Sequence, residues 1–375
     1  MLYLDHAATT PMRPEARRAM APWLDGEFGN PSGLHEVSRR ARNALEESRE
    51  RVAVVLGARP EDVVFTGGGT EAANLAVAGP ALASGLGNGV VVSAVEHEAV
   101  LATARYLAGR GYPLTVIPVD ADGVVDPDRV ADSVVPGTAL VSVMAANNET
   151  GVVQPVPAIA AALAGRGALL HSDAVQAAVS RPCGLDDLGA DLVTLSAHKL
   201  GGPQGVGVLA MRRGIALEPV VHGAGQELGR RSGTPNIAGI VGTAAAVEAA
   251  AADRKRLADD TAEGRDRFEQ HLAATVPDVV FTASHADRLV QHSHLRFPGI
   301  DAETLLIRLD ALGVAASAGS ACHSGAMTIS HVLDAMGMEP AVARECVRFT
   351  FGWDTPPEAG TRAAALVSTA VRALR

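Results

Sequence analysis

Short apolar runs alternate with amphipathic stretches over much of the chain. The runs predict buried strands at Val63–Thr66, Val90–Val95, Leu114–Val119, Ala139–Met144, Ala168–Ser172, Asp191–Ser196 and Val206–Met211. Between several of them lie segments with helical spacing: Glu71–Ala83, Ala99–Arg110 and Val156–Arg166. This alternation predicts an α/β architecture with a largely parallel sheet, and such sheets bind ligands beyond the carboxyl ends of their strands.

The pattern changes on both sides of this region. An extended arm precedes a first helix, and helical spacing then continues over Glu36–Leu56. A long Ala-rich helix over about residues 237–274 leads to further strand-like runs at 279–282, 292–297, 314–317 and 346–351. We expect a large domain at residues 14–255 with a mostly parallel seven-stranded sheet, and a smaller α+β domain formed by residues 1–13 and 256–375.

Composition and charge exclude several classes of protein. The chain of 375 residues carries a formal net charge of −10 and only 3% aromatic residues. A negative chain with few stacking side chains is a poor match to nucleic acid, whether double-stranded or single-stranded. The most apolar stretch, 237–252, contains glycines and a glutamate and is rich in alanine. We interpret it as a buried helix rather than a membrane span.

The cysteines and the N-terminus favour a cytoplasmic location. Cys183, Cys322 and Cys346 are odd in number and lie far apart, which excludes a disulfide framework and gives no paired spacing for a metal site. The N-terminus lacks a basic segment followed by an apolar one, so we expect no signal peptide. A reducing cytoplasm is the simplest compartment for such a chain.

Lysine is scarce, so few residues can take part in a reaction that needs a lysine amine. The chain has 30 Arg but only two Lys, Lys199 and Lys255. Lys255 lies in a run of charged residues, whereas Lys199 follows a predicted strand among small and apolar neighbours. A desolvated lysine has a lowered pKa and can form a Schiff base; the alternative is a surface lysine beside a Gly-rich turn.

Other polar residues follow the predicted strands. The segment Gly67–Glu71 offers backbone N–H groups to an anion; the alternative is a flexible loop in which Thr70 caps the next helix. The segment matches neither the Walker A motif nor the GxGxxG dinucleotide-binding motif. Asp173 ends a very apolar strand, where it needs a cationic partner such as a pyridinium nitrogen, or it caps the next helix. His97 is a candidate catalytic group or a helix-start histidine, and Asn148 is a candidate site residue or part of a simple turn.

Two further candidates lie near the C-terminus. Arg348 lies in an apolar run and needs an anion, either a structural carboxylate or a substrate carboxylate. Cys322 lies in a small, polar, Gly-rich segment, which favours a reactive thiol. Cys183 and Cys346 are more typical of inert cysteines.

A set of motifs occurs in an order that resembles one known family. The motifs are YLDHAATTP, FGNPSGLH, GGGTE, VEHEAVL, NNETG, HSDAVQ, SAHKLGGP, RRSGTPN and SAGSAC. From Tyr3 to about Arg372 the chain resembles the cysteine desulfurases of the NifS/IscS type. These are class V pyridoxal-phosphate (PLP) enzymes with the aspartate-aminotransferase fold. The resemblance therefore implies a PLP-dependent transferase that acts on L-cysteine as a homodimer.

The resemblance implies roles for the residues around the cofactor. Lys199 would bind PLP covalently, Asp173 would pair with its pyridinium nitrogen, and His97 would stack on the ring and take part in proton transfer. Gln176 would contact a ring oxygen and Val175 the other ring face. The remaining contacts would come from Asn148 and, at the phosphate, from Gly69, Thr70, Ser196, His198 and the neighbouring subunit's copy of Thr234.

The resemblance also implies how the substrate reacts. Asn148 and Arg348, together with Asn30, would hold the carboxylate of L-cysteine, and the Cys322 thiolate would attack its sulfur. A persulfide would remain on Cys322 and L-alanine would leave. The sulfur would pass to a protein or small-molecule acceptor, in iron–sulfur cluster biogenesis or another pathway. The resemblance implies no metal.

Some features leave alternatives open. The segment Cys322–His323–Ser324 resembles selenocysteine lyases of the same superfamily, whereas an ordinary class V aminotransferase has no use for Cys322. A non-catalytic sulfur-relay subunit is disfavoured because Lys199, Asp173 and Cys322 are all present. The chain stops at Arg375, whereas the IscS type carries a further segment that helps to dock the iron–sulfur scaffold protein, so we expect that another acceptor can apply.

Overall fold

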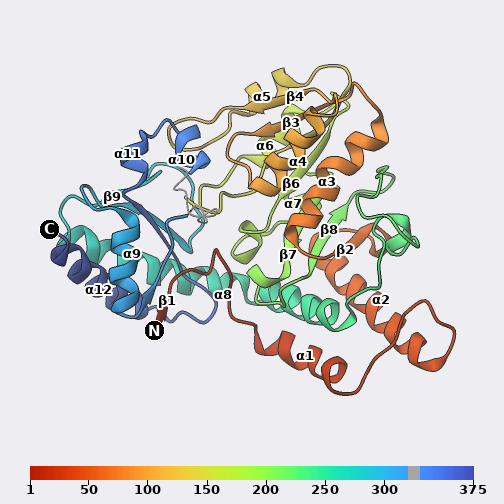
Figure 1. The fold of residues 1–375 in the computed structure, drawn as a ribbon, viewed down its shortest axis with the longest axis horizontal. Coiled ribbons are helices and arrows are strands. Elements are labelled where there is room, and N and C mark those ends of the chain that lie inside the picture. The colour runs from red at the N-terminus through yellow and green to blue at the C-terminus, as the bar shows by residue number, and fades with distance from the viewer. Residues whose placement is uncertain (320–329) are drawn as a thin grey trace.

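The computed structural model describes residues 1–319 and 330–375 of the chain. Its largest element is a seven-stranded sheet with the order β2-β8-β7-β6-β5-β3-β4 (Figure 1). The strands are β2 (Val63–Thr66), β3 (Gly89–Ser93), β4 (Leu114–Ile117), β5 (Thr138–Ser142), β6 (Leu169–Asp173), β7 (Leu192–Ser196) and β8 (Gly207–Met211). Each apolar run of the central region forms one of these strands, and the predicted fold class is confirmed.

Parallel pairing dominates this sheet. β3 pairs in parallel with β4 and β5, β5 pairs with β6, and β6 pairs with β7. β8 runs antiparallel to both of its neighbours, β7 and β2. Because parallel strands end at the same edge of a sheet, the residues that follow β3, β5, β6 and β7 come together there.

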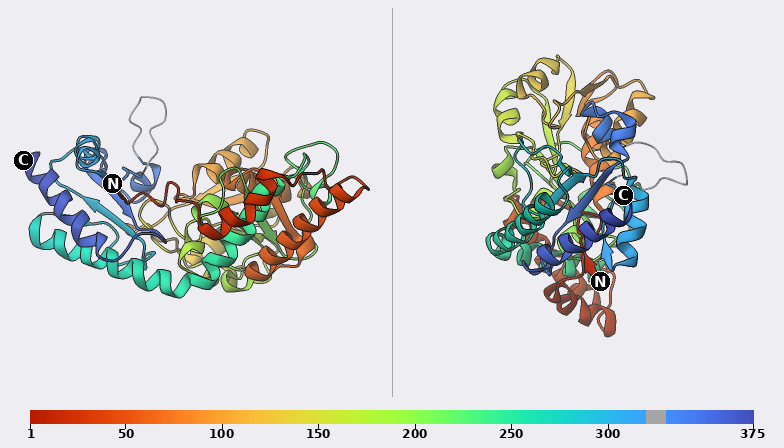
Figure 2. Two further views of the ribbon diagram at one scale, coloured as in Figure 1. Left: turned by 90° about the horizontal axis from the view of Figure 1, so that it is seen from below. Right: turned by 90° about the vertical axis from the view of Figure 1, so that its left-hand side faces the viewer.

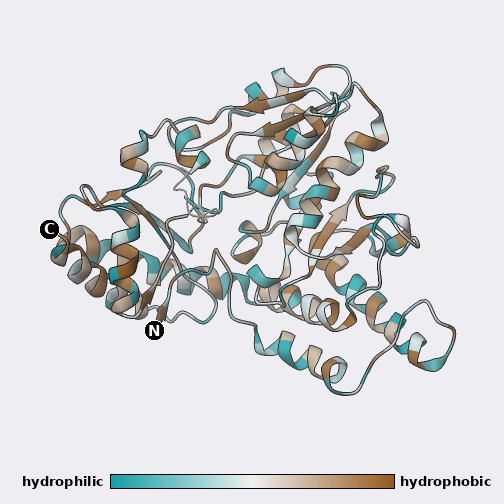
Figure 3. Ribbon diagram, viewed as in Figure 1, coloured by the Kyte–Doolittle hydropathy of each residue, from teal (hydrophilic) through white to brown (hydrophobic). Residues whose placement is uncertain are grey.

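Helices cover both faces of the large sheet (Figure 1). Val90 and Val92 of β3 pack in a core with α3 (Gly69–Ser84) and α4 (Glu98–Ala108). Val91 between them packs in a second core with α2 (Glu36–Leu56) and α8 (Ile237–Thr275). This alternation is what the pleat of a strand requires, and the strands are largely apolar along their length (Figure 3). The helices are α1 (Pro14–Asp25), α2 (Glu36–Leu56), α3 (Gly69–Ser84), α4 (Glu98–Ala108), α5 (Pro127–Ser133), α6 (Val156–Ala162), α7 (Leu185–Leu188) and α8 (Ile237–Thr275).

A smaller antiparallel sheet has the order β12-β10-β9, formed by β9 (Val280–Phe281), β10 (His292–Arg296) and β12 (Cys346–Thr350). Beside it β1 (Leu2–Tyr3) pairs in parallel with β11 (Val314–Ala315). The core of this part includes a cluster of phenylalanine rings: Phe268, Phe349 and Phe351. Its helices are α9 (Ala302–Ala311), α10 (His331–Ala335), α11 (Pro340–Ala343) and α12 (Ala359–Ala373).

One helix runs through both parts of the molecule. α8 has 39 residues; its first half packs in the core of the large sheet, and Phe268 and Leu272 in its second half pack in the core of the small one. Figure 2 shows this helix (teal) along one side of the molecule. The expected domain boundary at residue 255 lies inside α8, so the division into two domains stays a prediction. In the described part of the chain, no helix is both long and apolar enough to cross a membrane.

Candidate active site

A cleft of about 790 Å³ lies at the carboxyl ends of the parallel strands. Its walls come from the segments that follow β2, β3, β5, β6 and β7. The residues that sequence reasoning places around a cofactor meet in this cleft: Gly69, Thr70, His97, Asn148, Asp173, Val175, Gln176, Ser196, His198 and Lys199. The fold thus brings together residues that lie up to 130 positions apart in the sequence, from Gly69 to Lys199.

The N-terminus of α3 forms one end of the cleft. Gly68 has a φ of 154°, and Gly69 begins the helix. A Cβ atom on Gly69 would lie 2.9 Å from Cβ of Ser196, and one on Gly207 would lie 2.3 Å from the carbonyl of Gly68. The turn is so tightly packed that these positions require glycine. It presents the first backbone N–H groups of α3 to the cleft, an arrangement that suits an anion.

His198 lies beside this helix start. Burial, and then the positive charge of Lys199, lower the pKa of His198 to about 4. The imidazole is therefore neutral at physiological pH, and its Nδ1 lies 3.0 Å from Oγ1 of Thr9. A neutral ring can donate one hydrogen bond to an anion without a charge of its own.

Asp173 ends β6 inside the cleft. Its side chain is buried, and the backbone N–H of Val175 donates to Oδ1 at 2.9 Å. Burial raises the pKa of Asp173, an effect that His97, the Val175 N–H and Lys199 oppose. The residue before the next short helix is Gln176, so Asp173 is not a helix cap. An ionised carboxylate in this position needs a cationic group in the cleft.

Lys199 follows β7 and is not a surface lysine. Its Nζ donates to the backbone oxygens of Ala7 and Ala8 at 2.5 and 2.6 Å. Burial, and then the positive charge of Arg348, lower the pKa of Lys199 to about 8. Part of the amine is therefore neutral at physiological pH and can act as a base or a nucleophile. Lys255, by contrast, is exposed on α8.

His97 faces the cleft from the start of α4. Its Nδ1 accepts a hydrogen bond from the backbone N–H of Ala99 at 3.1 Å. In the neutral ring, Nε2 then carries the proton. One nitrogen caps the helix, as the helix-start alternative expects, and the rest of the ring is exposed in the cleft. A catalytic role for His97 stays a prediction.

The turn after β5 places Asn148 in the cleft. Oδ1 of Asn147 accepts from the backbone N–H groups of Glu149 and Thr150 at 2.9 and 3.0 Å. These bonds hold the turn in one shape. The backbone oxygen of Asn148 accepts from Nη1 of Arg348 at 2.9 Å, so the turn also connects the cleft to the small sheet.

Arg348 pairs with a structural carboxylate. It is 3% exposed, and its Nη2 lies 2.7 Å from Oδ1 of Asp5. The structure thus identifies one of the two expected kinds of anion. Arg348 lies beyond the residues that line the cleft but is near enough to lower the pKa of Lys199. A substrate carboxylate would have to use its remaining N–H groups or displace Asp5.

Two predicted residues lie elsewhere, and a third is outside the described part of the chain. Asn30 is exposed in the loop between α1 and α2, where its Oδ1 accepts from the backbone N–H of Ser32 at 3.0 Å. Thr234 lines a separate cavity of about 80 Å³ beside Arg231. Cys322 lies outside the residues that the structure describes.

Sequence reasoning missed several residues that line the cleft, among them Ala7, Asn74, Met144 and Gln204. Asn74 had a signal, because it lies one helical turn after Thr70 and its side chain donates to the Thr70 backbone oxygen at 2.8 Å. Ala7 had none, because it acts through a backbone carbonyl that every residue possesses.

Comparison with known proteins gives one consistent family. The model of the family "Aminotransferase class-V" matches residues 2–358. The cysteine desulfurase IscS of Dictyoglomus turgidum is 40% identical over 358 residues, which cover 95% of this chain and 91% of that protein. The solved structure of a NifS-like protein superimposes with a TM-score of 0.92 at 32% identity over the whole of both chains. The structure of SspA in complex with cysteine has a TM-score of 0.83 at 31% identity and covers 95% of this chain and 99% of that one.

Proposed function

Because the chain belongs to the class V aminotransferase family, we propose that it is a PLP-dependent cysteine desulfurase. It removes the sulfur of L-cysteine and releases L-alanine. Similarity to an IscS protein over nearly the whole chain supports the activity, and the complex of the related SspA with cysteine supports the substrate. The observation that carries the proposal is one cleft that holds a partly buried lysine amine, a buried carboxylate and a helix start whose backbone N–H groups suit an anion.

The cleft residues fit PLP by their chemistry. A phosphate matches the start of α3, beside Ser196 and His198. A pyridinium nitrogen supplies the cation that buried Asp173 needs. The aldehyde needs a primary amine, and Lys199 supplies it, because Lys255 lies exposed on α8. We propose that Lys199 binds PLP covalently while substrate is absent.

The reaction needs a base and an acceptor of charge at the substrate Cα. When bound, PLP supplies an electron sink for the negative charge that remains when the Cα proton leaves. The freed amine of Lys199 takes this proton, which its lowered pKa permits near neutral pH. His97 would stack on a bound ring and could move protons through Nε2, because Nδ1 is already bound to the Ala99 N–H.

The remaining predicted residues orient the two ligands. Val175 and Gln176 line the same cleft and would contact a bound ring, Val175 through its apolar side chain and Gln176 through an N–H group to the ring oxygen. We assign the substrate carboxylate to Asn148 and Arg348, whose backbone oxygen and Nη1 lie 2.9 Å apart. Asn30 lies outside this cleft of its own chain, and its part in substrate binding stays a prediction. A guanidinium suits this role because its N–H groups match a carboxylate in pairs.

We assign the sulfur-accepting thiol to Cys322 on the basis of its sequence context. Its thiolate forms a bond to the substrate sulfur while the substrate Cβ–S bond breaks. The carbon fragment keeps the electron pair of that bond, takes up a proton and leaves as alanine, and a persulfide stays on Cys322. Cys183 and Cys346 are unsuited, because burial raises the pKa of each to about 12.

We further propose a cytoplasmic homodimer. Thr234 reaches the phosphate bound by the neighbouring subunit, consistent with its place outside the cleft of its own chain. A protein or a small molecule then accepts the persulfide sulfur, for iron–sulfur cluster biogenesis or another pathway. The negative charge of the chain disfavours nucleic acid as a direct partner.

An absorbance spectrum of the purified protein before and after addition of L-cysteine, with sulfide and alanine measured under a reductant, tests the proposal. We expect a yellow band that shifts, and equal amounts of sulfide and alanine. The Lys199→Ala variant should lose the covalent band, and Cys322→Ser should keep the spectral shift but release no sulfide. Cys183→Ser is the matched control and should keep full activity. A protein that stays colourless after addition of PLP contradicts the proposal.

One sequence feature favours a second candidate, a selenocysteine lyase. The segment Cys322–His323–Ser324 resembles that of selenocysteine lyases in the same superfamily. The ratio of the kcat/KM values for L-cysteine and L-selenocysteine separates the two activities. A protein that is yellow but nearly inactive on L-cysteine supports the second candidate.

A further inference from the structure

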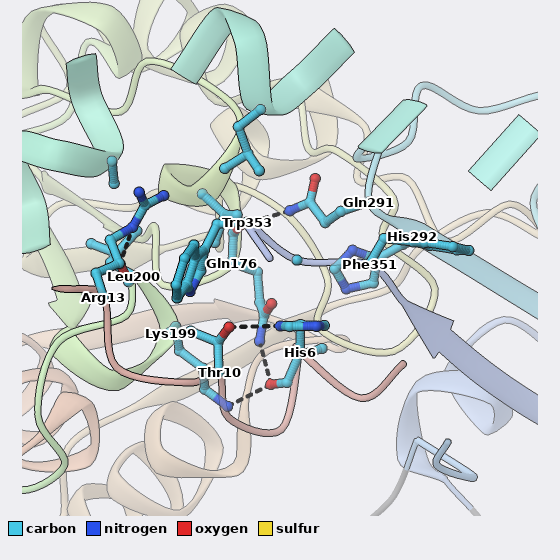
Figure 4. Close-up of a pocket in the computed structure, with 15 residues that line it drawn as sticks. His6, Thr10, Arg13, Gln176, Lys199, Leu200, Gln291, His292, Phe351 and Trp353 are labelled. Carbon is cyan, nitrogen blue, oxygen red and sulfur yellow. Dashed lines mark hydrogen bonds between the residues drawn. The ribbon is translucent and has the colours of Figure 1, made fainter. Parts of the chain in front are cut away.

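The first residues of the chain cross the molecule beside Lys199. We call residues 5–10 the strap. Near the small sheet, the backbone N–H of Ala7 donates to Oγ1 of Thr350 at 2.9 Å. At the other end, the backbone N–H of Thr10 donates to the backbone oxygen of His198 at 3.3 Å. The strap thus joins the small sheet to the segment that carries Lys199 (Figure 4).

Two backbone carbonyls of the strap face the amine of Lys199. Nζ donates to the oxygens of Ala7 and Ala8 at 2.5 and 2.6 Å. The Ala7 oxygen also accepts from Nε2 of Gln176 at 3.0 Å, and the two bonds converge on it in Figure 4. Because a carbonyl oxygen only accepts hydrogen bonds, it cannot face the lone pair of the amine. A neutral amine here commits both N–H groups to the strap, and its lone pair points away from the two carbonyls.

The side chain of His6 fixes the strap. It is 7% exposed; Nδ1 lies 2.6 Å from Oγ1 of Thr10, and Nε2 lies 3.1 Å from Oγ1 of Thr355. Burial lowers the pKa of His6, and a neutral ring suits two hydroxyl partners because it donates through one nitrogen and accepts through the other. Gly352 leaves the space for the ring, since a Cβ there would lie 2.0 Å from Nδ1.

We propose that the strap orients the amine of Lys199, with its lone pair facing the substrate, and that His6 is the positioning residue that holds the strap. The inference rests on the proposed function, in which this amine takes the Cα proton. A lysine side chain has four rotatable carbon bonds, so a free amine would otherwise sample many directions. Backbone carbonyls suit the task because they hold N–H groups but compete for no proton.

The first test observes Lys199 without reference to activity. The chain has only two lysines, so full-length PLP-free protein labelled with ¹³C at lysine Cε gives two signals, and exposed Lys255 is the internal reference. A fixed amine keeps its two Hε protons distinct, whereas a mobile one averages them. We expect distinct Hε shifts for Lys199 in the wild-type protein and averaged shifts in His6→Phe, which keeps the ring volume but loses both hydrogen bonds.

The second test measures the role of that orientation in the holoenzyme. We expect His6→Phe to lower kcat by about 10- to 100-fold, because a misdirected reacting group costs that much. KM should change by less than about twofold, since the substrate contacts remain. The kinetic isotope effect with Cα-deuterated L-cysteine should increase, because proton removal becomes the slow step. Thr10→Val removes one of the two hydroxyl partners of His6 and should show the same changes to a smaller extent.

A matched control is Thr369→Val on α12, where an exposed hydroxyl bonds only within its own helix. It should leave the NMR signals and the kinetics as in the wild type. Distinct Hε shifts in both strap variants, or averaged shifts with an unchanged isotope effect, would overturn the inference. If the wild-type holoenzyme releases no sulfide or alanine, the proposed function fails, and the NMR result still decides whether the strap holds Lys199.

Discussion

Glu96 offers a strong test of how burial controls charge in this fold. The residue precedes His97 and is fully buried. Its Oε1 accepts from Oγ of Ser93 and from the backbone N–H of Met144, each at 2.7 Å. Among the described residues its Oε2 has no hydrogen-bond partner, and the negative charge of Asp173 also disfavours ionisation of Glu96. The perturbation of choice is Glu96→Gln, which keeps the shape but cannot ionise.

The expected magnitude follows from the pKa of this carboxyl group. Burial raises the pKa of Glu96 from 4.5 to about 8. Between these values the native protein holds a proton that the unfolded chain has lost. The free energy of unfolding therefore decreases as the pH rises through this window, by about 1.4 kcal/mol per pH unit. Between pH 5.5 and 7.5 Glu96 should cost the wild-type protein about 2–3 kcal/mol relative to a neutral side chain.

Urea unfolding of both proteins at several pH values measures this effect. The stability of Glu96→Gln relative to the wild type should increase by about 2–3 kcal/mol from pH 5.5 to 7.5. Glu98→Gln is the matched control: Glu98 is exposed on α4 and pairs with Arg105, so its stability difference should stay nearly constant. A difference for Glu96→Gln that does not change with pH would refute the reasoning, because Glu96 would then be ionised in both states.

Three further predictions concern the cleft itself. Asp173→Asn removes the carboxylate that balances the charge of a cation in the cleft. Sulfide release in steady-state assays should therefore decrease by at least about 100-fold, and the visible absorbance band should shift. Gly207→Ala places a Cβ 2.3 Å from the Gly68 carbonyl, so urea unfolding should show a loss of about 1–3 kcal/mol, and fluorescence titration should show weaker PLP binding. In PLP-free protein an amine reagent should modify Lys199 half-maximally near pH 8, because only the neutral amine reacts. Lys255 should need a higher pH, because its hydrogen bond to Asp259 raises its pKa; peptide mass spectrometry distinguishes the two sites.

The sequence predicted helix bounds well where residues at the helix ends determine them. The helix over Glu36–Leu56 has its expected bounds, because His35 caps its start and Gly57 ends it with a φ of 65°. The helix expected at 156–166 ends earlier, at Ala162, because Gly165 and Gly167 adopt positive φ beyond it. Regular spacing of apolar residues continues past the point where the backbone leaves the helix, so pattern alone places such an end too late.

The pattern of residue types along the chain did not predict which distant residues contact each other. The sequence indicated that Arg348 needs an anion, but nothing in it pointed to Asp5, which lies 343 positions away. The carbonyls of Ala7 and Ala8 carry no signature at all, although they hold the amine on which the chemistry depends. A site residue could be predicted when its side chain was unusual for its surroundings. It could not be predicted when it acts through its backbone carbonyl, which every residue possesses.

The pairing of the two chain ends has a consequence for folding during synthesis. Leu2 pairs with Val314, and the strap meets Thr350, so the first ten residues lack their partners in the small sheet until nearly the whole chain exists. At typical rates of translation that delay is about 20–70 s. The large sheet can form in that interval, but Lys199 cannot yet acquire its native surroundings. The cleft is thus completed last, and a nascent chain cannot carry out the reaction before its synthesis is nearly finished.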